Sequence, residues 1–141
     1  MHSELTQLVR DRVACCNEGD WAGVRALTGA GYAYCEDGTG RRIDDVDEVL
    51  TALQRLRAAA PDAHIEVERV LAEGDVTVAE LVWSATLMQR GLRVADRAWA
   101  RWADGKVIAE WHEVGVLGLV APLVTAEEAA GGVVTAAPGW R

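Results

Sequence analysis

The chain has 141 residues, half of them apolar, which is enough for one hydrophobic core and one domain. Its formal net charge of −8, with no cluster of Lys or Arg to offset it, disfavours nucleic-acid and membrane-surface partners. No apolar run approaches the ~18 residues of a membrane span, and residues 1–4 lack the basic start of a signal peptide. We therefore expect a cytoplasmic protein.

The cysteines and histidines do not form a recognisable metal or disulfide pattern. There are three cysteines, an odd number, and two of them are the adjacent pair Cys15 and Cys16. The three histidines are widely dispersed along the chain. We expect reduced cysteines and no metal site.

Helical spacing of apolar residues dominates the first part of the chain. It predicts three helices, at residues 5–16, 21–27 and 46–56. Asp20 is the expected N-cap of the second helix, and Pro61 stops the third. A short strand is expected at residues 32–35.

From residue 64 the period of the pattern changes to two. It predicts a meander of four long strands, at residues 64–71, 76–87, 92–102 and 107–114. Three helices before an antiparallel sheet indicate an α+β fold with the helices on one face of a curved sheet. After Val116 we expect one short helical turn that ends before Pro122. Residues 1–124 would form the domain, and residues 125–141 a tail that is mobile or packs only through Trp140.

The last two predicted strands meet at Asp104-Gly105, a strong hairpin signal. On strand 92–102 the even positions are apolar or small except for Asp96, so the even face is the buried one. The odd positions, which carry arginines and Trp99, then face outward.

Two registers of this hairpin are open. A two-residue loop would place Asp96 opposite Glu113 and Arg97 opposite His112, two pairings of like character. A three-residue loop with Gly105 as a left-handed bulge residue would place Asp96 opposite His112. We favour the second register, which also places Arg97 against the outward-facing ring of Trp111.

An aspartate against a histidine on the inner face, with Ala98 and Ala100 leaving room beside them, is typical of an acid/base site. Asp96 would fix the tautomer of His112 and raise its basicity, so that the other ring nitrogen takes or gives a proton near neutral pH. The alternative is that the two side chains only satisfy each other in the core.

Four further residues are candidates for the same pocket. Tyr34 would donate a hydrogen bond to a developing enolate oxygen, or else only anchor its strand. Glu110 would be a second carboxylate with a raised pKa, or else lie at the open rim in water. Trp83 and Trp102 are candidate walls around the space beside Ala98, although core packing is the alternative for both rings.

Four segments carry a family resemblance: residues 17–21 (Asn-Glu-Gly-Asp-Trp), 32–34 (Tyr-Ala-Tyr), 60–67 (Ala-Pro-Asp-Ala-His-Ile-Glu-Val) and 102–112, which ends Glu-Trp-His. With the order of elements, over residues 5–123, the chain resembles the SnoaL-like polyketide cyclases of the nuclear-transport-factor-2-like superfamily. The resemblance implies a cone-shaped roll around one apolar pocket. It also implies a homodimer through the outer face of the sheet, where Trp99 and Trp111 lie. Because the superfamily holds cyclases, isomerases, dehydratases, epoxide hydrolases and binding modules, the fold alone does not decide the activity.

In cyclases of this family, ring closure is an intramolecular aldol reaction without metal or cofactor. An aspartate on the last strand acts as acid/base, and a histidine on the neighbouring strand assists it. Here His112 resembles the aspartate position and Ala98 the histidine position. The acid/base group has then either changed identity, with Asp96 supplying the carboxylate, or the aldol chemistry is absent. The epoxide-hydrolase branch uses an Asp/Arg/Asp set partly carried by the strand at residues 76–87, where Glu80 is the only charge, so that mechanism is disfavoured.

The leading hypothesis is a cofactor-independent cyclase or isomerase that acts on a hydrophobic, carbonyl-bearing, polyketide-like small molecule, as in antibiotic biosynthesis. His112 would be the general base, Asp96 its orienter and Tyr34 the oxyanion donor, while Trp83, Ala98, Trp102 and Glu110 would contact the substrate. The alternative is a non-catalytic member of the fold that binds a small hydrophobic ligand or only dimerises.

Overall fold

The computed structural model describes residues 2–136, and the side chains of residues 4–131. The elements are α1 (His2–Glu18), α2 (Trp21–Ala26), β1 (Thr28–Glu36), β2 (Arg42–Ile43), α3 (Val46–Ala59), β3 (His64–Glu73), β4 (Val76–Leu87), β5 (Arg90–Ala103), β6 (Lys106–His112) and α4 (Val116–Ala136). The predicted α+β class is confirmed, and the four strands of the meander begin and end within two residues of the predicted positions.

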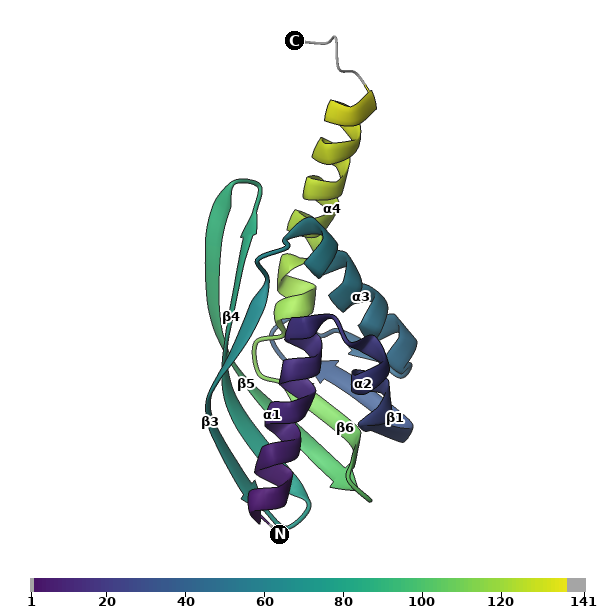
Figure 1. Cartoon of the computed structure of the whole chain (residues 1–141), viewed down its shortest axis with the longest axis vertical. Helices are drawn as coiled ribbons and strands as arrows, with labels where there is room; N and C mark the ends of the chain where they lie inside the picture. The colour runs from purple at the N-terminus through teal and green to yellow at the C-terminus, as the bar shows by residue number, and fades with distance from the viewer. Residues whose placement is uncertain (1, 137–141) are drawn as a thin grey trace.

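One six-stranded sheet, in the order β2-β1-β6-β5-β4-β3, forms the frame of the molecule (Figure 1). Neighbouring strands are antiparallel except β1 and β6, which are parallel. This pairing places the first strand of the chain beside the last one. The sheet curves, and the helices lie against its concave face (Figure 1). Buried residues of α1, α3 and α4 form one core with the inward side chains of the strands.

Local signals explain where the short helices begin. Asp20 caps α2, because its side chain accepts a hydrogen bond from the backbone N–H of Gly23, as predicted. Asp45 caps α3 in the same way through the N–H of Asp47. The third helix ends at Ala59, two residues before Pro61, which cannot continue it.

The last helix is much longer than expected. We predicted a single turn before Pro122 followed by a tail from residue 125, but α4 runs through Pro122 to Ala136. Its first part is buried in the core, and Glu128 near its middle forms an ion pair with Arg55 of α3. Glu127 also accepts the backbone N–H of Met88 at the β4–β5 turn. These contacts hold the helix despite the hydrogen bond that proline cannot make; Trp140 and the rest of the predicted tail lie outside the described residues.

The turn between β5 and β6 differs from the favoured prediction. Asp104 and Gly105 both have left-handed backbone angles, with φ of 52° and 74°, as a two-residue hairpin loop requires. The pairing begins at Ala103 and Lys106. Ile108 then forms a bulge, because Trp102 pairs with Val107 whereas the preceding residue of β5 pairs two positions further along β6.

The bulge sets a register that neither predicted loop gives. Ala98, and not Asp96, lies opposite His112. On the outer face Trp99 lies opposite Trp111, and the two rings stack with centroids 6.0 Å apart and planes 7° apart. The expected contact of Arg97 with Trp111 is therefore wrong, because Arg97 is paired with Glu113 instead.

Candidate active site

A small cavity lies between the concave face of the sheet and the helices, with a volume of about 90 Å³. From β5 the lining includes Ala98, Trp99, Ala100 and Trp102, and from β6 it includes Val107, Glu110 and His112. Val107 shares the inner face with Glu110 and His112 because the bulge at Ile108 shifts the two-residue period by one position. Six of the residues predicted to form the site line the cavity: Tyr34, Trp83, Ala98, Trp102, Glu110 and His112. The remaining one, Asp96, lies behind His112 and is not part of the lining.

His112 is held between two carboxylates. Its Nδ1 lies 2.9 Å from Oδ2 of Asp96, which confirms the predicted contact, and its Nε2 lies 2.8 Å from Oε1 of Glu110. Burial of the ring disfavours its charged form, but the two carboxylates outweigh this effect and raise the pKa of His112 to about 9. At neutral pH the ring is therefore an imidazolium that donates from both nitrogens.

Asp96 reaches His112 diagonally, from a position two residues along β5 from Ala98. Its side chain is fully buried, and Oδ1 accepts the backbone N–H groups of Arg97 and Val114, each at 2.8 Å. Burial favours the protonated acid, but these donors and His112 outweigh it and lower the pKa of Asp96. With Oδ1 anchored to the backbone, only Oδ2 is presented to the ring.

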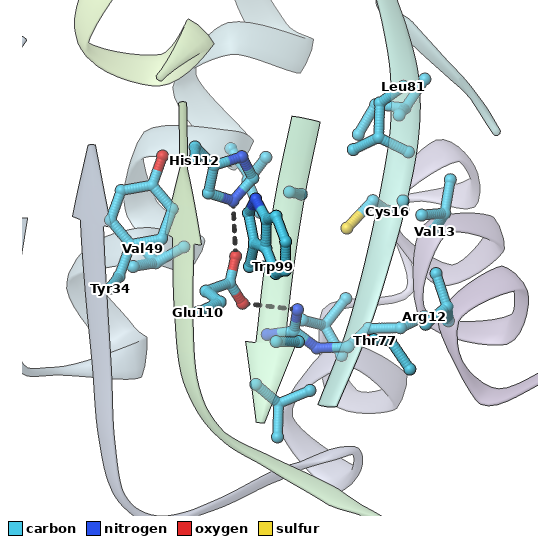
Figure 2. A pocket seen from close by; sticks show the side chains of 18 of the residues that line it. Arg12, Val13, Cys16, Tyr34, Val49, Thr77, Leu81, Trp99, Glu110 and His112 are labelled. Carbon is cyan, nitrogen blue, oxygen red and sulfur yellow. Dashed lines mark hydrogen bonds and ion pairs between the residues drawn. The ribbon is translucent and has the colours of Figure 1, made fainter. Parts of the chain in front are cut away.

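Glu110 differs from both interpretations that the sequence allowed. It is buried, not at an open rim, and its pKa is lowered, not raised. Burial alone would raise this pKa, but the charge of Arg12 and the contact with His112 outweigh that effect. Oε2 of Glu110 lies 2.7 Å from a terminal nitrogen of Arg12, so the carboxylate lies between two cations (Figure 2).

Arg12 was not predicted as a site residue. It projects from α1 toward β6, across 98 residues of sequence, and its side chain is only 16% exposed. The sequence carried a signal for this role. Arg12 lies at helical spacing within the stripe formed by Leu8, Val9 and Cys16, and all the other residues of that stripe are apolar. A cation in that stripe indicates a buried partner.

Tyr34 lies beside His112, with the ring centroids 5.0 Å apart (Figure 2). Its hydroxyl donates to Glu36, a third buried carboxylate, which lies one residue beyond the strand predicted at residues 32–35. Glu36 also accepts from the hydroxyl of Thr39 and the N–H of Gly118 at the start of α4. The Tyr34 proton is thus directed to Glu36 in this state, and burial together with Glu36 raises the pKa of the phenol.

The two tryptophans of the cavity wall differ in their polar contacts. Trp102 donates from Nε1 to Oγ1 of Thr77 at 2.9 Å, and both residues are buried. Trp83 Nε1 is buried and has no hydrogen-bond partner among the described side chains.

These features define a class of protein: a cone-shaped α+β roll that encloses a small, largely apolar cavity with a buried set of acid/base groups at one wall. The sequence profile of the SnoaL-like polyketide cyclases matches residues 6–123, so the chain belongs to that family. No curated protein matches the chain. No helix within residues 2–136 is long and apolar enough to cross a membrane.

Solved structures share this fold at low sequence identity. AclR, a candidate hydroxylase from Streptomyces galilaeus, is 21% identical with a TM-score of 0.71, over 87% of this chain and 97% of that one. IdmH, a candidate polyketide cyclase from Streptomyces antibioticus, is 20% identical with a TM-score of 0.70, over 82% and 96%. An epoxide hydrolase of the LEH-like type from M. tuberculosis is 18% identical with a TM-score of 0.71, over 97% and 98%. At these identities the likeness shows the fold and not the reaction.

Proposed function

We propose that this protein is a cofactor-independent acid/base enzyme, a cyclase or isomerase, that acts on a hydrophobic, carbonyl-bearing small molecule of the polyketide type. The observation that carries the proposal is a buried histidine, His112, held between two carboxylates at the wall of an apolar cavity. Such a group can donate and take back a proton without solvent.

The protonation state of His112 determines its role. With a pKa of about 9, His112 begins the reaction as an acid, and the general-base role expected from the sequence would require it to lose a proton first. We therefore assign to its Nε2–H, which faces the cavity-lining Glu110, the hydrogen bond to the substrate carbonyl oxygen.

The corresponding base is Glu110. When a substrate carbonyl oxygen replaces Glu110 as the acceptor of the Nε2–H bond, Oε1 of Glu110 becomes free to remove a proton from the carbon next to that carbonyl. The C–H electron pair becomes the enolate, the proton passes to Glu110, and the enolate oxygen is stabilised by the imidazolium of His112. Attack of the enolate carbon on a second carbonyl closes a ring and leaves an alkoxide, which takes the proton back from Glu110. Return of that proton to a different carbon of the enolate is instead an isomerisation.

The other predicted residues have supporting roles in this scheme. Asp96 keeps the charge on His112, as expected for an orienter. The oxyanion donor is His112 and not Tyr34, because the Tyr34 hydroxyl gives its hydrogen to Glu36. We propose that Tyr34, with Trp83, Ala98 and Trp102, forms the wall against which the substrate lies.

The cavity limits what the described state can hold. Its volume of about 90 Å³ is well below the roughly 300–1,000 Å³ of pockets for drug-sized ligands. A multi-ring molecule can therefore bind only if the wall opens, whereas a fragment of about one ring is closer to the space available.

One observation favours a second candidate, a non-catalytic module that binds a small hydrophobic ligand. Ion pairs join the charged side chains in one line, from Asp96 through His112 and Glu110 to Arg12, so their charges balance and the wall needs no reaction to account for these contacts.

Exchange of α-protons for deuterium distinguishes the two candidates without knowledge of the natural substrate. Phenylacetone and cyclohexanone, two neutral ketones with a single ring, are incubated with the protein in D₂O, and loss of the α-proton signal is followed by NMR. We expect acceleration by the wild type and a loss of about 100-fold or more in His112→Ala and Glu110→Gln. Glu113→Gln is the matched control, because Glu113 lies on the outer face with Arg97 and Trp99. Saturable binding without exchange would favour the binding module and contradict the enzyme.

We also propose that the chain forms a homodimer through the outer face of the sheet. The stacked pair Trp99 and Trp111 lies there, together with Leu71, which is 49% exposed. Light scattering after gel filtration should show a dimer for the wild type and a monomer for Trp111→Lys. The control is Leu119→Lys on α4, an apolar residue that is as exposed as Leu71. A monomeric wild type would contradict the proposal.

A further inference from the structure

Arg12 is the residue at the cavity wall whose role the acid/base scheme leaves open. It is the cation at the end of a line of four charges whose signs alternate, namely the buried Asp96, His112 and Glu110 and the partly buried Arg12. The line joins β5 and β6 to α1, so its geometry depends on how the first helix packs against the last strands.

Two contacts fix the guanidinium. One terminal nitrogen lies 2.7 Å from Oε2 of Glu110, and the other donates to Oγ1 of Thr28 at 3.2 Å. The planar group also lies over the ring of Tyr32, 5.9 Å from its centroid. Because Arg12 occupies Oε2, the other oxygen of Glu110 is the one left for His112.

We propose that Arg12 is a positioning residue for the acid/base pair: it keeps Glu110 ionised and turns Oε1 toward His112, so that the shared proton stays on the imidazole. This inference rests on the proposed function for its catalytic meaning, although the proton placement itself can be measured without a substrate.

The groups around Glu110 show why Arg12 is needed for this. The titratable groups that face the site are Arg12 and Cys16 from α1, Tyr32, Tyr34 and Glu36 from β1, Asp96 from β5 and His112 from β6. The cavity-lining residues of α3 and α4, namely Val49, Leu53 and Leu117, are apolar. Without Arg12, His112 is the one cation left at this wall among the side chains of residues 4–131, and it is already paired with Asp96. Burial would then favour the protonated acid of Glu110.

The test follows Glu110 directly. The protein is labelled with ¹³C at the glutamate side-chain carboxyl carbon, the Glu110 signal is assigned from its loss in Glu110→Gln, and the signal is titrated with acid. In the wild type the pKa of Glu110 lies below the ordinary range. In Arg12→Met we expect it to rise by about one to three pH units, the usual effect of one adjacent opposite charge. In Arg12→Lys, which keeps the charge, it should stay below about 4.3, the ordinary value for Glu.

A second Arg–Glu pair provides the control. Arg55 pairs with Glu128 at the surface, and Arg55→Met should leave the titration of Glu110 unchanged. Arg12→Met with no rise in the Glu110 pKa would overturn the proposal. If Arg12→Met does not fold, Arg12→Lys carries the test, because a Glu110 pKa at or above its ordinary value there would overturn it equally. The α-proton exchange assay is read separately: a shifted Glu110 titration in a protein without exchange activity would contradict the proposed function and leave the role of Arg12 in proton placement intact.

Discussion

Asp96→Asn tests the protonation state of the site, because the side chain keeps its shape and loses its charge. In the wild type Oδ1 of Asp96 accepts two backbone N–H groups, and Oδ2 faces Nδ1 of His112. The single oxygen of an asparagine would be held by the same two backbone donors, so that its NH₂ group faces His112. A donor at this place requires His112 to accept at Nδ1, which is the neutral ring. We therefore expect the pKa of His112 to fall from about 9 to 6.5 or below.

The size of the effect follows from the two values for His112, 6.5 in the unfolded chain and about 9 in the folded protein. A folded pKa above the unfolded one stabilises the protein fully below pH 6.5, and this contribution is lost as the pH rises through 9. At about 1.36 kcal/mol per pH unit, it amounts to about 3 kcal/mol. In Asp96→Asn it is absent.

Urea unfolding of both proteins between pH 5.5 and about pH 9.5 measures the difference. We expect Asp96→Asn to be less stable by about 3 kcal/mol below pH 6.5 and the gap to shrink by that amount toward pH 9.5. The thiols and other groups that titrate in this range affect both proteins alike and cancel in the comparison. A gap that does not change with pH would refute the reasoning, because the lost stability would then owe nothing to the proton on His112.

Two further matched pairs test the packing around the site. Trp102→Phe should cost about 1–3 kcal/mol more unfolding free energy than Trp83→Phe, because both remove the same atoms but only Trp102 has a hydrogen-bond partner to leave unsatisfied; equal costs in urea unfolding would contradict this. Gly115→Ala should destabilise more than Gly40→Ala. Both positions have left-handed φ, 85° and 75°, but an added Cβ at Gly115 would lie 2.6 Å from Cδ of Glu36, whereas at Gly40 it meets nothing. In thermal unfolding, Gly40→Ala should lower the unfolding free energy by about 1–2 kcal/mol, and Gly115→Ala should lower it clearly more. Similar melting temperatures for the two variants would be inconsistent with a rigid Glu36.

The sequence predicted the contact of Asp96 with His112 although the predicted register was wrong. The favoured register and the observed one differ by two residues at His112, which preserves the face on which each side chain lies. The carboxylate of Asp96 then reaches the ring diagonally. The bulge at Ile108, which causes the difference, has no side-chain signature, and a β-branched apolar residue reads as ordinary strand.

The role of Arg12 and the length of α4 were not predicted for the same physical reason: both depend on contacts between residues far apart in the sequence. The contact of Arg12 with Glu110 spans 98 residues, and α4 is held by pairs such as Arg55 with Glu128, 73 residues apart. Periodicity reports which face of an element is buried, but not which distant element covers it. Glu36 could have been predicted from the period of a strand, because it lies two residues after Tyr34 and therefore on the same face of β1.

The energetics of the charged line favour a chemical role over a purely structural one. Removing four charges from water costs several kcal/mol per ion, and apolar side chains of similar volume often pack in such a place with equal or better stability. Asp96 and Arg12 hold His112 and Glu110 in one protonation state and one orientation. The two residues that are held in this way, His112 and Glu110, line the cavity. A core that needed only stability would gain little from this arrangement, whereas a site that moves a proton needs an acid and a base whose pKa values are held apart, as those of His112 and Glu110 are.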